Sequence, residues 1–250
     1  MSDHMIYEWN DPTKVKPLFE GFEDATLEAC LQGMAGKVYV TDPENPRSAM
    51  AHAGGFAFCG GEPDRELVCG KPEGYVIMVP QNEDWASLIE TCFPAIKMIR
   101  YAIKKEAKFD REKLEAMAGA LPSGYEIKRI DADLYDLCAS TPEFRDFVNT
   151  FASKENYLEN GLGMVVTKDG KIVSGASSYA RYREGIDIEV ETVREERCKG
   201  LARAVCAALI LRCLDEGLVP RWDAANKMSV RLAEKLGFEF SHEYYCFGVS

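Results

Sequence analysis

The sequence contains no long apolar stretch, no pair of cysteines with CxxC spacing, and only three histidines among its 250 residues. A helix that crosses a bilayer needs about 20 consecutive apolar residues, so we expect no membrane span and no membrane partner. The first residues are too few and too polar for a targeting peptide. The nine cysteines, an odd number spread from Cys30 to Cys246, are typical of reduced thiols. We therefore expect a cytoplasmic protein without a metal site.

Positive charge is also scarce, because 30 lysines and arginines face 41 aspartates and glutamates and leave a formal net charge of -11. This balance disfavours a nucleic-acid partner and mildly favours cationic or neutral small molecules. No GxGxxG motif follows an expected strand, which argues against a nucleotide-binding oxidoreductase. The sequence shows no short-period repeat and no low-complexity segment, so solenoid architectures are excluded.

What is present is a globular chain, 46% hydrophobic and 28% charged, that can bury one large core or two ordinary ones. The breaker cluster Leu121-Pro122-Ser123-Gly124 divides it. We predict an N-terminal α/β domain over residues 1–121 and a second domain over residues 122–250.

The N-terminal half mixes helical and extended patterns without a chemical signature. We expect helices over 17–22, 24–33, 85–96 and from Asp110 to about Met117, and strands over 37–41 and 74–79. The segment GGFAFCGGEPD, residues 54–64, resembles a phosphate-binding loop, but Gly61 stands where the lysine is required. Paired glycines around a short apolar run are more typical of strand ends and turns, and we predict these.

The second half carries, after an extended run over 125–130, a strong hairpin signal. Alternating residues over 162–167 and 172–182 flank Asp169-Gly170, which is typical of a tight two-residue turn. A third strand follows Gly185 and places Ile186, Ile188 and Val190 on one face and Asp187, Glu189, Glu191 and Val193 on the other. The pattern predicts a three-strand antiparallel meander.

A helix is expected next, over residues 199–216, and Gly217 ends it. Apolar residues at helical spacing form one stripe along this helix, so we expect the helix to pack on a sheet. We expect Cys206 and Cys213 to be small core residues. The stripe consists of Ala202, Val205, Leu209 and Cys213. A strand over 219–223, a helix between Asn226 and Gly237, and a strand over 238–247 complete the expected order.

The pattern Arg197-x-x-Gly200-x-Ala202 lies where the third strand meets this helix. The first turn of a helix leaves backbone N–H groups without internal partners, and the helix dipole adds partial positive charge. A residue without Cβ and a small neighbour let a diphosphate approach these groups, and Arg197 adds a cation at the rim. The alternative is an ordinary helix start with a glycine near it.

With these motifs in place, the stretch from Gly124 to the C-terminus resembles a GNAT-superfamily acyltransferase domain. The order of strands, the Arg197–Ala202 loop and the later segment NKMSVRLAEKLGF carry the resemblance. The complete chain is further similar to a bacterial GNAT branch that includes zwittermicin-resistance-type acetyltransferases. The resemblance implies a mixed α/β fold whose central sheet splays where acyl-CoA inserts. It leaves the N-terminal domain as a substrate-side element or a degenerate GNAT-like domain.

The resemblance also implies a set of residues that bind acetyl-CoA. The backbone of Val193 would hold the pantetheine arm, and the loop amides would receive the diphosphate. Asn226 would contact the cofactor, unless it serves only as a helix N-cap. The full set comprises Val193, Arg197, Cys198, Lys199, Gly200, Leu201, Ala202, Arg203, Asn226 and Ser229.

The implied reaction is direct attack of a small-molecule primary amine on the acetyl thioester. Glu189 and Glu191 are candidate bases for the ammonium proton, and the alternative is a solvated acidic strand face. Ala233 stands where many relatives carry a tyrosine that protonates the leaving thiolate. Tyr244 and Tyr245 are candidate replacements, and only one of them can face a cleft. A catalytically silent acyl-CoA sensor or interaction module stays open as an alternative, and the sequence does not indicate an oligomeric state.

Overall fold

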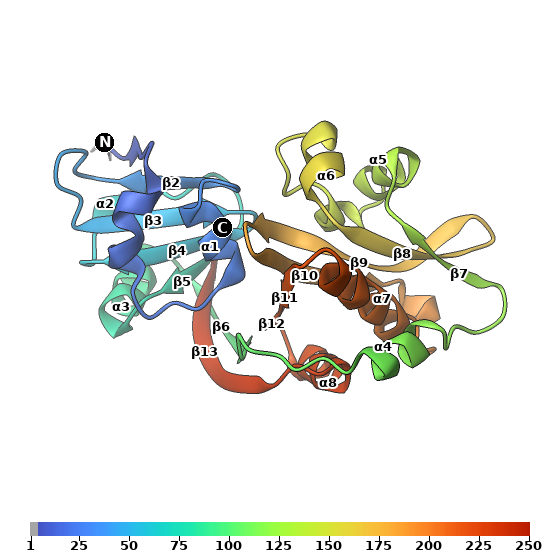
Figure 1. Cartoon of the computed structure of the whole chain (residues 1–250). Helices are drawn as coiled ribbons and strands as arrows, with labels where there is room; N and C mark the ends of the chain where they lie inside the picture. Colours follow the sequence, from blue (N-terminus) through green and yellow to red (C-terminus); the bar gives the residue numbers. More distant parts are fainter. Residues whose placement is uncertain (1–4) are drawn as a thin grey trace. The chain divides into compact units, whose positions relative to one another are not determined.

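The computed structural model describes residues 5–250, which divide into two compact units (Figure 1). The first comprises the residues up to Arg100 together with Glu243–Ser250, and the second comprises Tyr101–His242. The chain passes from one unit to the other within the strands β6 (Ile96–Ile103) and β13 (Phe240–Val249).

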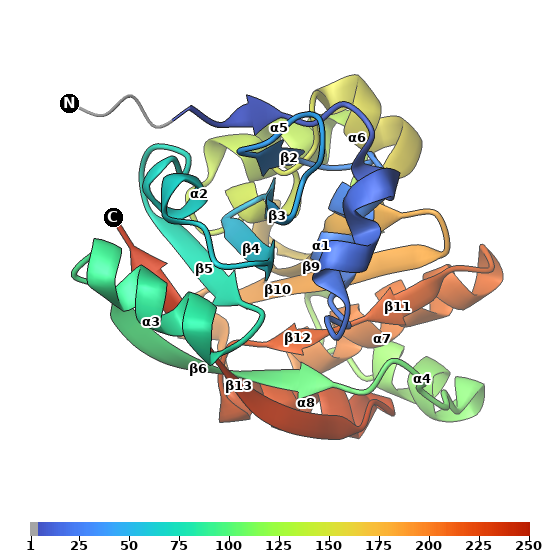
Figure 2. The same ribbon diagram turned by 90° about the vertical axis from the view of Figure 1, so that its left-hand side faces the viewer.

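The first unit is built on an antiparallel run of strands (Figure 2). The strands β1 (Tyr7–Glu8), β2 (Lys37–Val40), β3 (Ser48–Ala53) and β4 (Phe56–Gly61) pair in this order. β5 (Val76–Pro80) lies parallel to β4, and the end of β13 pairs antiparallel with β5. The helices of this unit are η1 (Pro12–Phe19), α1 (Ala25–Leu31), α2 (Arg65–Cys69) and α3 (Glu83–Cys92).

Two buried clusters lie on opposite faces of this sheet. Strand β3 shows the alternation, because Ala49 and Ala51 pack with η1 and α1 while Met50 packs with α2 and α3. The predicted turn at Gly54-Gly55 connects β3 to β4, so the glycine-rich segment is a strand and its ends. The helix predicted over 17–22 is found only in part: a 3-10 helix, η1, begins at Pro12 and ends at Phe19.

The second unit holds the sheet β11-β10-β9-β8-β7. Neighbouring strands are antiparallel except for β10 and β11, which are parallel. The strands are β7 (Tyr125–Arg129), β8 (Gly163–Lys168), β9 (Lys171–Tyr182), β10 (Gly185–Thr192) and β11 (Val219–Arg221), with the short β12 (Asp223–Ala224) outside this sheet. The helices are α4 (Arg111–Ala118), α5 (Ala132–Ser140), η2 (Arg145–Phe147), α6 (Lys154–Asn160), η3 (Arg194–Glu196), α7 (Leu201–Asp215) and α8 (Lys227–Leu236).

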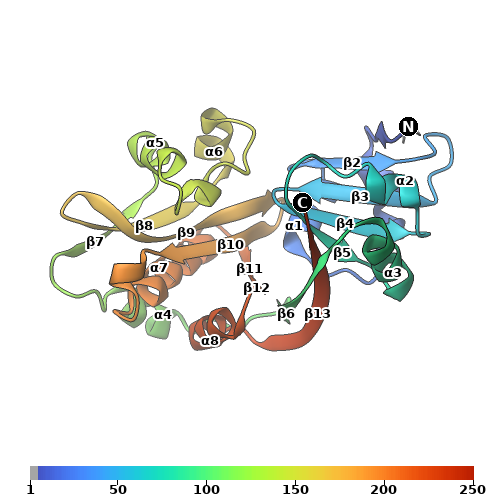
Figure 3. The same ribbon diagram turned by 180° about the vertical axis from the view of Figure 1, so that it is seen from behind.

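Helices cover both faces of this sheet (Figure 3). On one face Val205, Leu209 and Cys213 of the predicted α7 stripe are fully buried and pack with α4 and α8, whereas Ala202 is half-buried. On the other face α5, η2 and α6 surround Phe147 and Tyr157. The mixed α/β fold predicted from the sequence is confirmed. So is the meander: the turn residues Asp169 and Gly170 have φ of 49° and 76°, as a type I′ hairpin requires.

The division into units differs from the predicted boundary at residues 121 and 122, which lies inside the second unit between α4 and β7. The physical reason is packing: Leu114 and Met117 of α4, followed by Leu121, belong to the core beneath α7. The C-terminal end of β13 belongs to the first unit because it pairs with β5 there.

Candidate functional site

The sheet of the second unit splays along β10. Strand β11 pairs only with Gly185, Ile186 and Asp187 at the start of β10. The chain then turns away, and β12 pairs with β6 through Ala102 and Tyr101 instead. Within residues 5–250, β9 is therefore the single strand partner of β10 from Ile188 onward, and the other edge of β10 is open.

The hydrogen bonds of β10 show which backbone groups point to this open edge. Val193 donates its N–H to the Val173 carbonyl at 3.0 Å, and its own carbonyl accepts from the Glu196 N–H at 3.0 Å. Both backbone groups of Val193, predicted to hold a ligand arm, thus have protein partners. Because the direction alternates along an antiparallel strand, the groups at the open edge belong to Ile188, Val190 and Thr192.

The loop between β10 and α7 has two left-handed residues. Cys198 has φ of 65°, and Gly200, the N-cap of α7, has φ of 83° and ψ of 3°. A Cβ on Gly200 would meet nothing closer than the Arg203 Nη2 atom at 3.6 Å. The glycine is therefore required by the backbone conformation and not by crowding from neighbouring atoms.

This loop presents a row of unpaired donors. In the described part of the chain, the six successive amides of residues 198–203 have no backbone or side-chain acceptor. The first internal helix bond is donated by Ala204 to the Gly200 carbonyl at 3.1 Å, and no side chain of residues 5–250 caps the start of α7. Six N–H groups at the positive end of a 15-residue helix form a site suited to a bound anion.

Arg197 fixes the loop to the open strand. Its Nε donates to the Thr192 carbonyl at 3.0 Å, and its Nη2 donates to Glu191 Oε1 at the same distance. Glu191 Oε1 also accepts from the Thr192 N–H at 2.7 Å. One oxygen of the Glu191 carboxylate therefore holds Arg197, and this hydrogen bond links the Glu191 side chain directly to the loop.

The two candidate bases lie on the same face of β10, since Glu189 and Glu191 are two residues apart and β10 keeps its alternation. This face is the one toward η2, because Phe147 contacts Gly175 on β9 opposite Glu191. Both side chains are partly exposed, so both are accessible to solvent.

The second helix of the predicted set is built as a capped helix. The Asn226 side chain accepts from the Ser229 N–H at 3.0 Å, and the Ser229 hydroxyl accepts from Trp222 Nε1 at 2.9 Å. Ala233, farther along α8, is fully buried in the core and presents no group that could donate a proton. The cap role of Asn226 is thus visible, and a contact of Asn226 or Ser229 with a ligand stays a prediction.

Tyr244 and Tyr245 belong to the first unit, whereas the loop and β10 belong to the second. Tyr244 packs against the buried cluster beside α1. Tyr245 is 51% exposed, and the Lys97 ammonium lies 4.3 Å from the centroid of its ring. The structure brings Glu191, Arg197 and the loop amides together, and it does not place either tyrosine in their unit.

Sequence reasoning missed three polar residues beside the loop. Glu196 contacts Tyr125 and Lys168 as well as Lys199, although Tyr125 is 71 residues away along the chain. No local spacing links such residues, and only the pairing of β7 with β8 brings Tyr125 opposite Lys168.

The cysteines of α7 are core residues, as predicted. Cys206 and Cys213 are fully buried, and burial raises the pKa of the Cys213 thiol to about 12. Of the nine free thiols, Cys198 in the loop is the exposed one. No group of three or more potential metal ligands occurs within residues 5–250, and no helix in that range is long and apolar enough to cross a bilayer.

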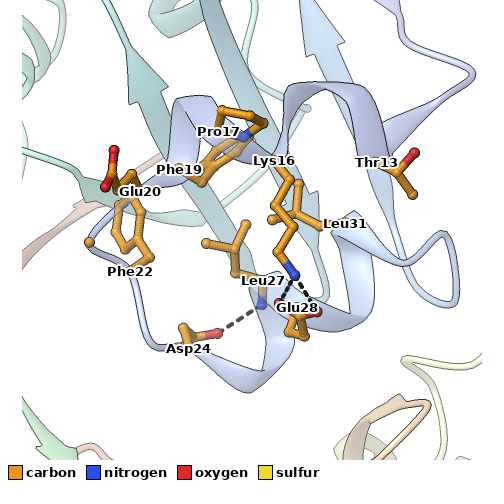
Figure 4. A pocket seen from close by; sticks show the side chains of 11 residues that line it. Thr13, Lys16, Pro17, Phe19, Glu20, Phe22, Asp24, Leu27, Glu28 and Leu31 are labelled. Carbon is orange, nitrogen blue, oxygen red and sulfur yellow. Dashed lines mark hydrogen bonds and ion pairs between the residues drawn. The ribbon is translucent and has the colours of Figure 1, made fainter.

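A groove of about 540 Å³ lies on the first unit between η1 and α1 (Figure 4). Two of its three carboxylates have partners: Lys16 Nζ lies 2.8 Å from Glu28 Oε1, and Asp24 accepts from the Leu27 N–H at 2.8 Å. Apolar side chains that include Phe19 and Phe22 line the remainder. We assign no chemistry to this groove.

Comparison with known proteins agrees with this geometry. A family model described as GNAT acetyltransferase matches residues 16–247. The uncharacterized N-acetyltransferase YdfB of Bacillus subtilis is 28% identical over 236 residues, or 85% of each chain. A GCN5-related N-acetyltransferase-like protein from Streptococcus suis has a similar structure, with 39% identity and a TM-score of 0.91 over 96% of this chain and 98% of that one.

More distant structures share the fold alone. A tandem GNAT protein from the clavulanic acid biosynthesis pathway superposes with a TM-score of 0.57 at 13% identity, over 98% of both chains. The family match extends across both compact units and includes the splayed strand and the amide-bearing loop. The chain therefore belongs to the GNAT acetyltransferase family.

Proposed function

We propose that the protein is an acetyl-CoA-dependent N-acetyltransferase that transfers the acetyl group directly to a primary amine of a small molecule. The observation that carries this proposal is the run of six unpaired amides at residues 198–203, next to the open edge of β10. Donors at a helix start suit the diphosphate of CoA, and an open strand edge suits the amide groups of its pantetheine arm.

The residues present fit this ligand. The amides of residues 198–203 would hold the diphosphate, and the backbone groups of Val190 at the open edge would pair with the arm. Arg197 lies between the two sets and already donates to Thr192. When bound, acetyl-CoA supplies an acetyl thioester that an amine can attack without a covalent enzyme intermediate.

The acceptor must lose a proton before it attacks, because an ammonium has no lone pair. Glu189 and Glu191 are the proposed proton acceptors on β10. Glu191 Oε1 already accepts from Arg197 and Thr192, and this gives Glu191 a second role in holding Arg197. The net charge of -11 favours a cationic or neutral amine as the acceptor.

The leaving thiolate needs no acid at the position of Ala233. A thiol with a pKa near 8.5 is a tolerable leaving group at neutral pH, so unassisted departure is compatible with turnover. Tyr244 and Tyr245 stay candidate proton donors.

The buried Ala233 also favours a second candidate function. A domain that binds acyl-CoA but lacks the usual acid could act as a sensor or interaction module without turnover. Both functions require the loop, and they differ in whether acetyl groups are transferred.

One experiment separates these functions. The protein is incubated with acetyl-CoA and a panel of primary amines, and free thiol is followed together with the melting temperature. We expect thiol release with at least one amine and stabilisation by CoA. Stabilisation without thiol release on any amine supports the sensor, and the absence of both at millimolar CoA contradicts the proposed function.

A further inference from the structure

Glu196, the last residue of η3, forms a polar cluster just before the amide-bearing loop. Lys199 Nζ lies 2.6 Å from Glu196 Oε2, and the Tyr125 hydroxyl donates to the same oxygen at 2.5 Å. Lys168 Nζ lies 3.3 Å from the other oxygen, Oε1. The Glu196 side chain is only 13% exposed, so this carboxylate is largely enclosed by its three partners.

Two of the three partners come from the far side of the sheet. Tyr125 begins β7 and Lys168 ends β8, and these two residues face each other in the β7–β8 register. In the sheet order β11-β10-β9-β8-β7, they lie on the opposite side of β9 from β10. Glu196 therefore ties the loop that follows β10 to strands with which β10 does not pair within the described residues.

The charges of this cluster are stable at neutral pH. The Lys199 ammonium, followed by the Tyr125 hydroxyl, lowers the pKa of Glu196 to about 2. The hydrogen bond to Glu196 raises the pKa of Lys199, and those to Tyr125 and Glu196 raise the pKa of Lys168. One carboxylate thus holds two ammonium groups and one phenol in fixed positions.

We propose that Glu196 is a positioning residue, which holds the loop in the conformation that presents the amides of residues 198–203 and so sets the affinity for the diphosphate of acyl-CoA. The second half of this inference rests on the proposed function, and the first half does not. Two local backbone hydrogen bonds hold the segment around Glu196: its N–H donates to the Val193 carbonyl at 3.0 Å, and the Arg197 N–H donates to the Arg194 carbonyl at 3.4 Å. Loss of the Glu196 carboxylate would remove the side-chain bonds that hold this segment to β7 and β8.

A neighbouring residue separates positioning from charge. Glu195 lies in the same short helix and is exposed, and its side chain has no hydrogen-bond or ion-pair partner among the described residues. Glu195→Gln and Glu196→Gln remove the same charge near the same anion site. If charge alone mattered, both variants would bind the anionic ligand as well as or better than the wild type, because one repulsive carboxylate is gone.

Positioning predicts the opposite for Glu196 alone. We expect Glu196→Gln to raise the Kd for CoA, and the KM for acetyl-CoA, about tenfold or more, with kcat little changed. Glu195→Gln should stay within about twofold of the wild type. Tyr125→Phe, which keeps the ring and removes one donor, should shift the Kd in the same direction as Glu196→Gln by a smaller factor.

Hydrogen exchange of the ligand-free proteins tests the loop independently of CoA. The amides of Glu196 and Ala204 have backbone partners at both ends of the loop, and we expect them to exchange faster in Glu196→Gln than in the wild type or Glu195→Gln. If these amides exchange faster in Glu196→Gln but the wild-type protein does not bind CoA, the positioning role is supported and the proposed function is contradicted. Two results would overturn the inference. One is that amide exchange in both Glu196→Gln and Tyr125→Phe equals that of the wild type. The other is that the wild type binds CoA and both variants bind it with the same affinity.

Discussion

Replacing Gly200 by alanine tests whether the left-handed backbone at the start of α7 is needed for ligand binding. The new Cβ has space, because its nearest neighbour would be Arg203 Nη2 at 3.6 Å. The cost comes from φ of 83°, a region that costs a residue with a Cβ roughly 1–2 kcal/mol. We expect the exposed loop to relax in the free protein and thereby escape this strain.

Binding must then restore the left-handed conformation, so the same 1–2 kcal/mol is lost from the binding free energy. A loss of this size corresponds to a rise in the Kd for CoA of roughly 5–30-fold. Titration calorimetry with CoA measures this change, and far-UV circular dichroism checks that the helices are intact. Gly200→Glu adds bulk and negative charge, and we expect it to abolish binding.

Gly217 provides the matched control at the other end of α7. It has φ of 70°, and a Cβ there would meet no atom within 4 Å. Gly217→Ala carries a similar backbone strain far along the helix from the loop, so it should lower the melting temperature without changing the Kd for CoA. Wild-type CoA affinity in Gly200→Ala, or an equal loss of affinity in Gly217→Ala, would refute the reasoning.

Three further predictions concern side chains. Glu189→Gln should suppress kcat and shift the acidic limb of the pH–rate profile, whereas Glu191→Gln, which removes the charge from the ion pair with the loop arginine, should also raise the KM for acetyl-CoA; full activity in both variants would place the base elsewhere. Tyr244→Phe and Tyr245→Phe should each cost less than about tenfold in kcat, because a thiolate leaves unaided; a hundredfold loss with CoA binding intact would identify that tyrosine as the acid. The pKa of Glu196 is lowered from 4.5 to about 2, so its stabilisation is present above pH 4.5 and is lost as the pH falls toward 2. In urea unfolding, the stability difference between wild type and Glu196→Gln should therefore shrink over this window, and a constant difference would contradict the ion pairs.

The parts of the fold that follow local rules were predictable from the sequence. Asp169-Gly170 specifies a hairpin because both turn residues take positive φ, and the helix caps at Asp110 and Asn226 accept the backbone bonds expected of them. Helix α7 begins at Leu201, two residues later than its pattern suggested, because the residue before it is left-handed.

Long-range pairing was beyond such rules. The end of β13 joins the first unit through β5, and α4 joins the second unit through α7, so the boundary near Leu121 does not separate the compact units. Strand β6 was not expected, because the helical pattern extends to Ile96 while Pro94 shortens the helix to Cys92.

The candidate site shows the same division. The loop from Arg197 to Arg203 was recognisable because its glycine and its small residue are close together in sequence. The backbone groups of Val190 and Thr192, and not those of Val193, point to the open edge of β10. This follows from the hydrogen bond that the Val193 N–H donates to β9. Such a register is fixed by tertiary pairing and cannot be deduced from the alternation of side chains.

The most direct measurement is an amide NMR titration of the wild-type protein with CoA and, separately, with pantetheine, which lacks the diphosphate. We predict that CoA shifts the amide resonances of residues 198–203 more than those of any other segment, and that pantetheine leaves them unchanged. If millimolar CoA leaves these six amides unshifted, or if pantetheine moves them as strongly as CoA does, the loop is not the diphosphate site.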